Sequence, residues 1–237
     1  NDATTQEVAV DNYLSQLDSL NLKNITIGLP KEFYGEGVTE EVKQAIDKKV
    51  EELKAKGATI KEVSIPSTNY GLGVYYILVP AEISSNRARY DGVRYGQKVS
   101  DNYEQNMVES RSKYLEEEVK RRIMIGTYSL SAGYADQFYK QASKVRTKLK
   151  REFEVALKEV DCLLTPVSPT TAFKLGEKAN DPVQMYLVDI YTVTANLVGV
   201  PAIAIPAGKD KDGMPIGLQI MGRQFEEGKL MGVAREI

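Results

Sequence analysis

The chain has 237 residues, 31 of them basic and 33 acidic, with one cysteine and no histidine or tryptophan. Without histidine, this sequence holds no Ser-His-Asp or Cys-His catalytic group and no zinc site that needs imidazole, and one cysteine forms neither an intramolecular disulfide nor a multi-thiolate metal site. The net charge of −2 gives no overall electrostatic case for nucleic-acid binding, and without a long apolar stretch or a signal-peptide pattern we expect a cytoplasmic protein.

The first 65 residues have the pattern of a β-α-β unit. A short apolar strand is expected at 25–30 and a second, alternating strand at 59–65. Between them, Thr39 suits a helix N-cap and Gly57 suits a helix C-terminus. The apolar positions of this helix recur every three or four residues, which predicts one buried stripe formed by Val42, Ile46, Val50 and Leu53. Strand, helix and strand within about 40 residues predict parallel pairing.

The middle of the chain, from about residue 70 to 157, is expected to be mostly helical. It contains a charged helix around 116–122 and a long amphipathic helix at about 135–159. A buried strand is expected to follow at 161–166.

The last part is expected to begin with a helix and end with two strands. Asp181 and Pro182 suit the N-cap and first position of a helix that ends near 197–199. Strands at 202–206 and 217–221 are joined through a turn at 209–213. The predicted fold class is therefore α/β, with a mixed, largely parallel sheet layered by helices, and residues 1–237 are expected to form part of a single domain.

Both ends of the sequence are expected to lie inside a longer protein. The chain begins at Asn1 rather than at methionine, and it stops at Ile237 within an apolar, helical-looking run. We therefore expect a fragment whose N-terminal half, with part of the chemistry, is absent.

Asp189 is the most informative single residue, because it is the only charge in the apolar stretch 183–193. A helix that is apolar on nearly all sides is expected to be buried, and a carboxylate there must be paired, bound to a cation or neutral. An internal salt bridge or a helix cap explains Asp189 as well as a functional role does. The functional role is recognition of a cationic ligand group such as an ammonium.

The segment Lys-Arg-Arg at 120–122 supplies a candidate for the opposite charge. Arg121 and Arg122 point about 100° apart on a helix, so one can face solvent while the other faces inward. An inward guanidinium suits bidentate recognition of a carboxylate, although a solvated charged face beside the glutamates at 116–118 is the more ordinary outcome.

Two further features add polar groups upstream. The segment 82–92 is dense in hydrogen-bonding side chains, and the adjacent Tyr75 and Tyr76 place one ring in the core and the other toward a surface or pocket. Core packing is the usual role of such a ring.

Several segments together resemble the amidase signature family, most closely the branch formed by the glutaminase subunits of tRNA-dependent amidotransferases. The proline- and glycine-rich strand ends are general to the family, whereas the Lys-Arg-Arg-Ile block and the segment 81–96 look specific to that branch. The likeness runs from about Val10 to Ile237, and the segments that carry it are 81–96, 118–134, 144–147, 164–173, 196–201 and 213–222.

The resemblance implies an amidase signature fold, present here in part, and an amide hydrolysis by a Ser-cis-Ser-Lys triad. The family's nucleophile lies in a Gly-Gly-Ser-Ser-Gly-Gly-type loop, and its order places that loop and the lysine upstream of this chain. Ser84 and Ser85 lack the flanking glycines, so the triad is not assigned to them. This chain is therefore expected to contain no catalytic residue, to bind no metal and to be inactive alone.

The resemblance also implies a glutamine-binding wall within this chain. Asp189 would hold the α-ammonium, Arg122 would clamp the α-carboxylate, and Tyr75 would add a hydrogen bond, with Tyr76 and Arg121 as the adjacent alternatives. The expected partners are the B and C subunits of the amidotransferase, with ATP, magnesium and most of the tRNA contact on the B subunit. A stand-alone amidase acting on another amide is the alternative parent.

Overall fold

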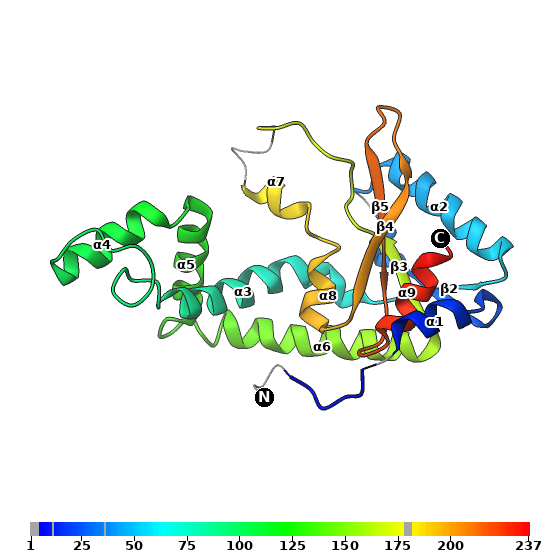
Figure 1. The fold of residues 1–237 in the computed structure, drawn as a ribbon, viewed down its shortest axis with the longest axis horizontal. Helices are drawn as coiled ribbons and strands as arrows, with labels where there is room; N and C mark the ends of the chain where they lie inside the picture. The colour runs from blue at the N-terminus through cyan, green and yellow to red at the C-terminus, as the bar shows by residue number, and fades with distance from the viewer. Residues whose placement is uncertain (1–4, 11, 36, 178–181) are drawn as a thin grey trace. The chain divides into compact units, whose positions relative to one another are not determined.

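The computed structural model describes residues 5–10, 12–35, 37–177 and 182–237. The chain divides into two compact units, one formed by Asn1–Leu72 with Lys148–Ile237 and the other by Gly73–Thr147. The elements of both are labelled in Figure 1. The expectation of a single amidase-type domain stays a prediction, because one domain can contain two compact units.

The larger unit is built on a mixed sheet. Within the described residues, five strands pair in the order β2-β1-β3-β5-β4. The strand β1 pairs in parallel with β2 and β3, whereas β5 pairs antiparallel with β3 and β4. The predicted mixed α/β sheet is confirmed. The strands are β1 (Thr26–Pro30), β2 (Thr59–Val63), β3 (Cys162–Pro166), β4 (Ala202–Lys209) and β5 (Pro215–Met221).

The helix α2 (Glu40–Ala55) follows the sequence pattern closely. Thr39 occupies the N-cap, where its backbone carbonyl accepts from the Lys43 amide at 3.1 Å and its side chain makes no capping bond. Gly57 has φ of 102° at the other end, a conformation that favours glycine. The four buried residues of α2 are the predicted stripe, Val42, Ile46, Val50 and Leu53.

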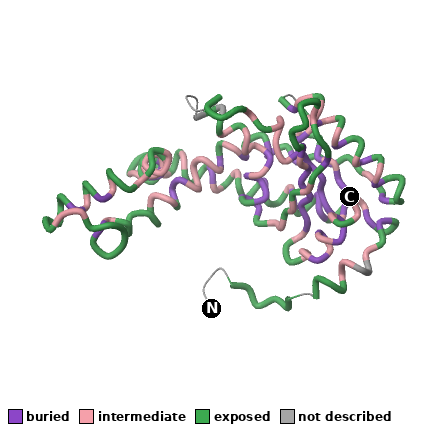
Figure 2. Tube along the Cα trace, turned by 45° about the horizontal axis from the view of Figure 1, so that its top comes forward, coloured by how far each residue is buried: buried purple, intermediate pink, exposed green. Residues whose placement is uncertain are grey.

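The core of the larger unit lies along β3, whose five residues are all buried. Figure 2 marks the buried segments of the trace in purple; β5 is mostly buried as well, whereas β2 and β4 are mostly exposed or intermediate. Each fully buried leucine or isoleucine here contributes roughly 1.5–3 kcal/mol of apolar burial. The Tyr34 hydroxyl donates to the Leu164 carbonyl of β3 at 2.7 Å. Burial raises the pKa of Cys162 to about 12, so this thiol is protonated at neutral pH.

Asp161, just before β3, connects β1 with the C-terminal helix α9 (Glu227–Arg235). Its Oδ2 accepts from the Thr26 amide at 2.8 Å, and its Oδ1 pairs with Lys229 of α9. Burial alone would raise the pKa of Asp161, but these contacts hold it below its ordinary value. Helix α1 (Tyr13–Ser19) packs on α9, and 3₁₀ turns lie at Leu22–Asn24, Lys31–Tyr34 and Pro66–Tyr70.

The predicted continuous helix after Pro182 is wrong. The structure has two six-residue helices, α7 (Pro182–Leu187) and α8 (Val193–Val198), separated by turns at 188–192. Helix α8 is buried and ends at Gly199 as expected, whereas α7 is exposed at Val183, Met185 and Leu187. Apolar composition buries a helix only where another surface covers it. The predicted N-cap Asp181 lies outside the described residues.

The smaller unit is helical, as the sequence predicts. Its elements are α3 (Gly71–Arg87), α4 (Tyr103–Tyr114), α5 (Glu117–Leu130) and the first part of α6 (Tyr139–Glu159). Among the residues described between 73 and 147, no buried side chain is larger than valine or asparagine.

An ordered loop joins α3 to α4. Asn106 of α4 is 3% exposed; its Oδ1 accepts from the Val99 amide at 2.7 Å and the Ser100 amide at 3.2 Å, and its Nδ2 donates to the Gly92 carbonyl at 2.8 Å. One buried amide side chain thus holds two separate parts of the loop, Gly92 and 99–100, against α4. No helix in the described parts of the chain combines the length and the apolarity needed to cross a bilayer.

Candidate functional site

Arg122 lies on the second turn of α5 and is the more buried of the two adjacent arginines. Its side chain is 24% exposed, against 45% for Arg121. Its Nε donates to Glu118 Oε1, one turn earlier, at 2.8 Å, and Arg121 pairs with the other oxygen of the same carboxylate. Both guanidinium groups therefore pair with Glu118, which is the ion pairing expected of a charged face beside the glutamates at 116–118, although Arg122 is the more buried of the two.

The guanidinium of Arg122 also lies over an aromatic ring of α3. Its Cζ is 5.4 Å from the centroid of Tyr76, and the rings of Tyr75 and Tyr76 meet edge to face with centroids 5.2 Å apart. Burial alone would lower the pKa of Arg122, but the bond to Glu118 and the neighbouring Tyr76 raise it above its ordinary value. The structure therefore brings Arg122, Tyr76 and Tyr75 into one cluster, with Tyr76 in direct contact with the cation.

Asp189 lies in the larger unit, within the turns between α7 and α8. Its amide donates to the Tyr186 carbonyl at 3.1 Å, and its own carbonyl accepts from the amides of Thr192 at 3.0 Å and Val193 at 3.1 Å. The residue is half-buried rather than enclosed by a helix that is apolar on all sides, so that part of the argument for it is wrong. The joint action of Asp189 with Arg122 stays a prediction.

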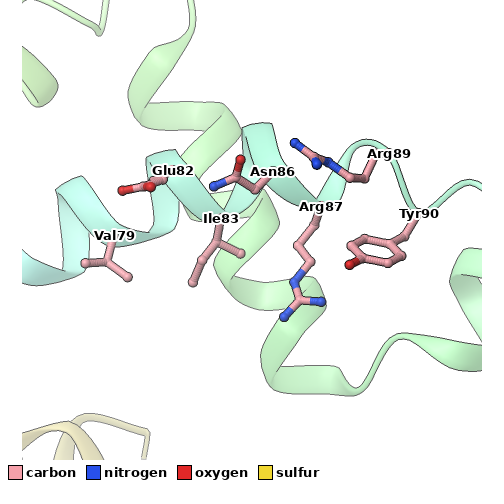
Figure 3. Close-up of a pocket in the computed structure, with 7 residues that line it drawn as sticks. All are labelled: Val79, Glu82, Ile83, Asn86, Arg87, Arg89 and Tyr90. Atoms are coloured by element: carbon pink, nitrogen blue, oxygen red, sulfur yellow. The ribbon is translucent and has the colours of Figure 1, made fainter. Parts of the chain in front are cut away.

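A pocket of about 370 Å³ lies along 79–90, over the C-terminal part of α3. Figure 3 shows Glu82 toward one end and Arg87 beside Tyr90 at the other. The Cζ of Arg87 is 5.3 Å from the Tyr90 ring, and Arg111 donates to the carbonyls of both residues at 3.0 Å. This is the polar segment that the sequence singled out, and its pocket combines a carboxylate with two guanidinium groups.

The paired serines 84 and 85 are helical residues rather than part of a glycine-flanked loop. Both lie within α3, and the Ser84 hydroxyl donates to the Ala81 carbonyl at 2.8 Å. The Ser84 hydroxyl is thus engaged with the backbone of its own helix. The expected absence of a catalytic residue from this chain stays a prediction.

The comparisons with known proteins all point to one family. The family model described as Amidase matches residues 1–231. Over 236 residues the chain is 50% identical to the A subunit of the glutamyl-tRNA(Gln) amidotransferase of Thermoanaerobacter pseudethanolicus, covering 98% of this chain and 48% of that protein. The chain spans about half the length of the curated relatives it matches.

Solved structures agree in fold. The A subunit of the glutamyl-tRNA(Gln) amidotransferase of Thermotoga maritima superposes with a TM-score of 0.76 at 36% identity, over 100% of this chain and 46% of that one. The crystal structure of an amidase gives a TM-score of 0.71 at 25% identity, over 92% of this chain and 46% of that chain.

Proposed function

This chain belongs to the amidase family, and from that premise we propose that it is the glutamine-recognising half of a glutaminase subunit. In this proposal the complete subunit hydrolyses glutamine to glutamate and ammonia, and the ammonia converts Glu-tRNA(Gln) to Gln-tRNA(Gln). The names of the relatives support this reading, since those at 46–50% identity are A subunits of glutamyl-tRNA(Gln) amidotransferases.

The observation that carries the proposal is the half-buried guanidinium of Arg122. Glu118 engages it through Nε, and Tyr76 lies against its face. A carboxylate binds a guanidinium best as a bidentate pair, and the edge formed by the two terminal nitrogens suits that geometry. Because two protein groups already orient the cation, little side-chain entropy is lost when an α-carboxylate arrives.

The other two binding roles rest on residue chemistry and on the family resemblance. Asp189 supplies a half-buried carboxylate for the α-ammonium. Tyr75 supplies a hydroxyl for a hydrogen bond, and its ring packs on that of Tyr76. Together these groups match the charges of a free α-amino acid, which an apolar amide would not need.

The bond-breaking groups of the proposal lie outside this chain. A Ser-cis-Ser-Lys triad on the other half of the subunit would attack the carboxamide, so this chain alone is expected to be inactive. The B and C subunits of the amidotransferase would be the partners in a cytoplasmic complex, with ATP, magnesium and most of the tRNA contact on the B subunit.

The test is glutamine hydrolysis by the complete subunit carrying Arg122→Ala or Asp189→Ala. Each variant is expected to raise KM for glutamine by about tenfold or more, because each removes a charge-assisted contact to the amino acid. Arg121→Ala is the matched control, since that side chain pairs with the same Glu118 but is more exposed. Unchanged glutamine hydrolysis in both variants would show that the binding roles are wrong.

A second measurement tests the tRNA-dependent role. Affinity purification of the complete subunit is expected to recover two partner subunits. Recovery without partners, together with hydrolysis of an uncharged amide in preference to glutamine, would instead indicate a stand-alone amidase.

A further inference from the structure

Helices α3 and α5 cross with their backbones in direct contact. Gly126 of α5 is buried against Pro80 of α3, and a Cβ on Gly126 would overlap the Pro80 carbonyl and come within 2.9 Å of the Ala81 amide nitrogen. Backbone atoms cannot move aside as the end of a flexible side chain can. The crossing therefore accepts only glycine at position 126 in its present geometry.

This crossing lies one turn from the cation–ring contact on both helices. Gly126 follows Arg122 by four residues, and Pro80 follows Tyr76 by four residues. Residues four apart share one face of a helix and are separated by about 6 Å along its axis. The spacing of the helices at Gly126 and Pro80 thus sets the spacing at which Arg122 meets Tyr76.

Small buried side chains accompany the contact of Gly126 with Pro80. The buried neighbours at the crossing are small, namely Ala81 and Ser129, and the Ser129 hydroxyl donates to the Gly126 carbonyl at 3.0 Å. A glycine inside a helix costs about 1 kcal/mol relative to alanine, so its place here needs a compensating contact, and the crossing supplies one.

We propose that Gly126 and Pro80 are positioning residues for glutamine recognition, because their backbone contact sets where the Arg122 guanidinium lies. This inference rests on the proposed function, in which Arg122 binds the α-carboxylate. A methyl group at position 126 forces the helices apart and moves Arg122 relative to Tyr76, while the groups that break the amide bond are untouched.

The experiment compares Gly126→Ala with Gly73→Ala in the complete subunit. Gly73 is the matched control, since it lies in α3 and a Cβ there meets nothing within 4 Å. Each variant is assayed with glutamine and with 4-aminobutanamide, which keeps the ammonium and the amide but lacks the α-carboxylate. Thermal melting and the active fraction are measured in parallel.

Gly126→Ala is expected to raise KM for glutamine by about tenfold to a hundredfold and to change kcat by less than about threefold. Its kcat/KM for 4-aminobutanamide is expected to stay close to that of the unmodified protein. Gly73→Ala is expected to leave kcat and KM unchanged for both substrates. If Gly126→Ala does not fold, Ala81→Val enlarges a buried neighbour at the same crossing and is expected to give the same selective loss.

Equal losses on both substrates, or a loss of kcat at unchanged KM, would overturn the inference and indicate a purely structural glycine. Arg122→Ala distinguishes a failure of the proposed function from a failure of the positioning role alone. If Arg122→Ala leaves the preference for glutamine over 4-aminobutanamide unchanged, the proposed function fails. If Arg122→Ala abolishes that preference and Gly126→Ala retains it, only the positioning role fails.

Discussion

Arg122→Lys tests carboxylate recognition without removing the charge. Lysine donates from one point and cannot reproduce a planar, bidentate edge. The Arg122 side chain is 24% exposed, so its contacts fall between a surface pair, which contributes about 0–1 kcal/mol, and a buried pair, whose disruption costs about 3–5 kcal/mol. We expect a loss of about 1.4–2.8 kcal/mol in glutamine binding, which is a tenfold to hundredfold rise in KM.

The cost of the same substitution to folding should be smaller. The variant loses the stacking of Arg122 on Tyr76, which contributes about 0.5–1 kcal/mol, and weakens an i,i+4 pair with Glu118 that contributes about 0.3–0.5 kcal/mol. Melting temperature should therefore change by only a few degrees while KM changes strongly. That difference separates a binding effect from a loss of folded protein.

The assay is steady-state glutamine hydrolysis by the complete subunit, with Arg121→Lys as the control. Arg121 pairs with the same carboxylate but is 45% exposed, so its substitution is expected to change KM by less than about twofold. Equal KM values in the two lysine variants would refute the reasoning. A drop in kcat at constant KM in Arg122→Lys would also refute it, since that pattern assigns the arginine to chemistry rather than to substrate binding.

Three further predictions concern stability. Contacts with Lys229 and the backbone lower the pKa of Asp161, so its contribution to stability is present above about pH 4 and is lost as pH falls through the lowered pKa. In Asp161→Asn, the unfolding free energy should therefore vary less with pH in this range, and it should be about 1–2 kcal/mol lower at about pH 7. Asn106→Ala removes three hydrogen bonds, so amides at 92–100 should lose about 2–3 kcal/mol of protection in hydrogen exchange, and unchanged exchange would contradict this. Tyr34→Phe removes the donor to Leu164 and should lower the unfolding free energy by about 1 kcal/mol in denaturant titration.

The sheet and its first helix could be predicted from sequence because their signals are local. The stripe of α2 repeats every three or four residues, and Gly57 adopts the positive φ that its position at the helix end requires. The hairpin of β4 and β5 is predictable for the same reason: two apolar strands flank a turn rich in aspartate and glycine. In Figure 1 the turn end of this hairpin extends beyond the neighbouring strands.

The helix after Pro182 could not be predicted in the same way, because burial depends on what covers a surface. Apolar residues at 183–193 indicate one enclosed helix, but the chain turns at 188–192 and leaves Val183 63% exposed. The sequence pattern therefore overestimates how deeply Asp189 is buried. The contact of Arg122 with Tyr76 could not be predicted from the sequence either. It depends on how α3 and α5, which are far apart in the sequence, cross in space, whereas the sequence gives only the residue types.

The two charges proposed to bind glutamine are held in different ways, and from this difference we infer which end of the substrate determines specificity. Arg122 lies within a fourteen-residue helix, with a carboxylate and an aromatic ring already against it. Asp189 lies in turns between two six-residue helices, where backbone bonds rather than a long helix set its place. A preset guanidinium favours selection of the α-carboxylate by geometry, because a misplaced anion loses the bidentate pair. The Asp189 carboxylate is carried by a turn rather than by a long helix, so we expect it to be the less rigidly placed of the two charges. Discrimination among amides should therefore depend more on the carboxylate end of the substrate than on the ammonium end.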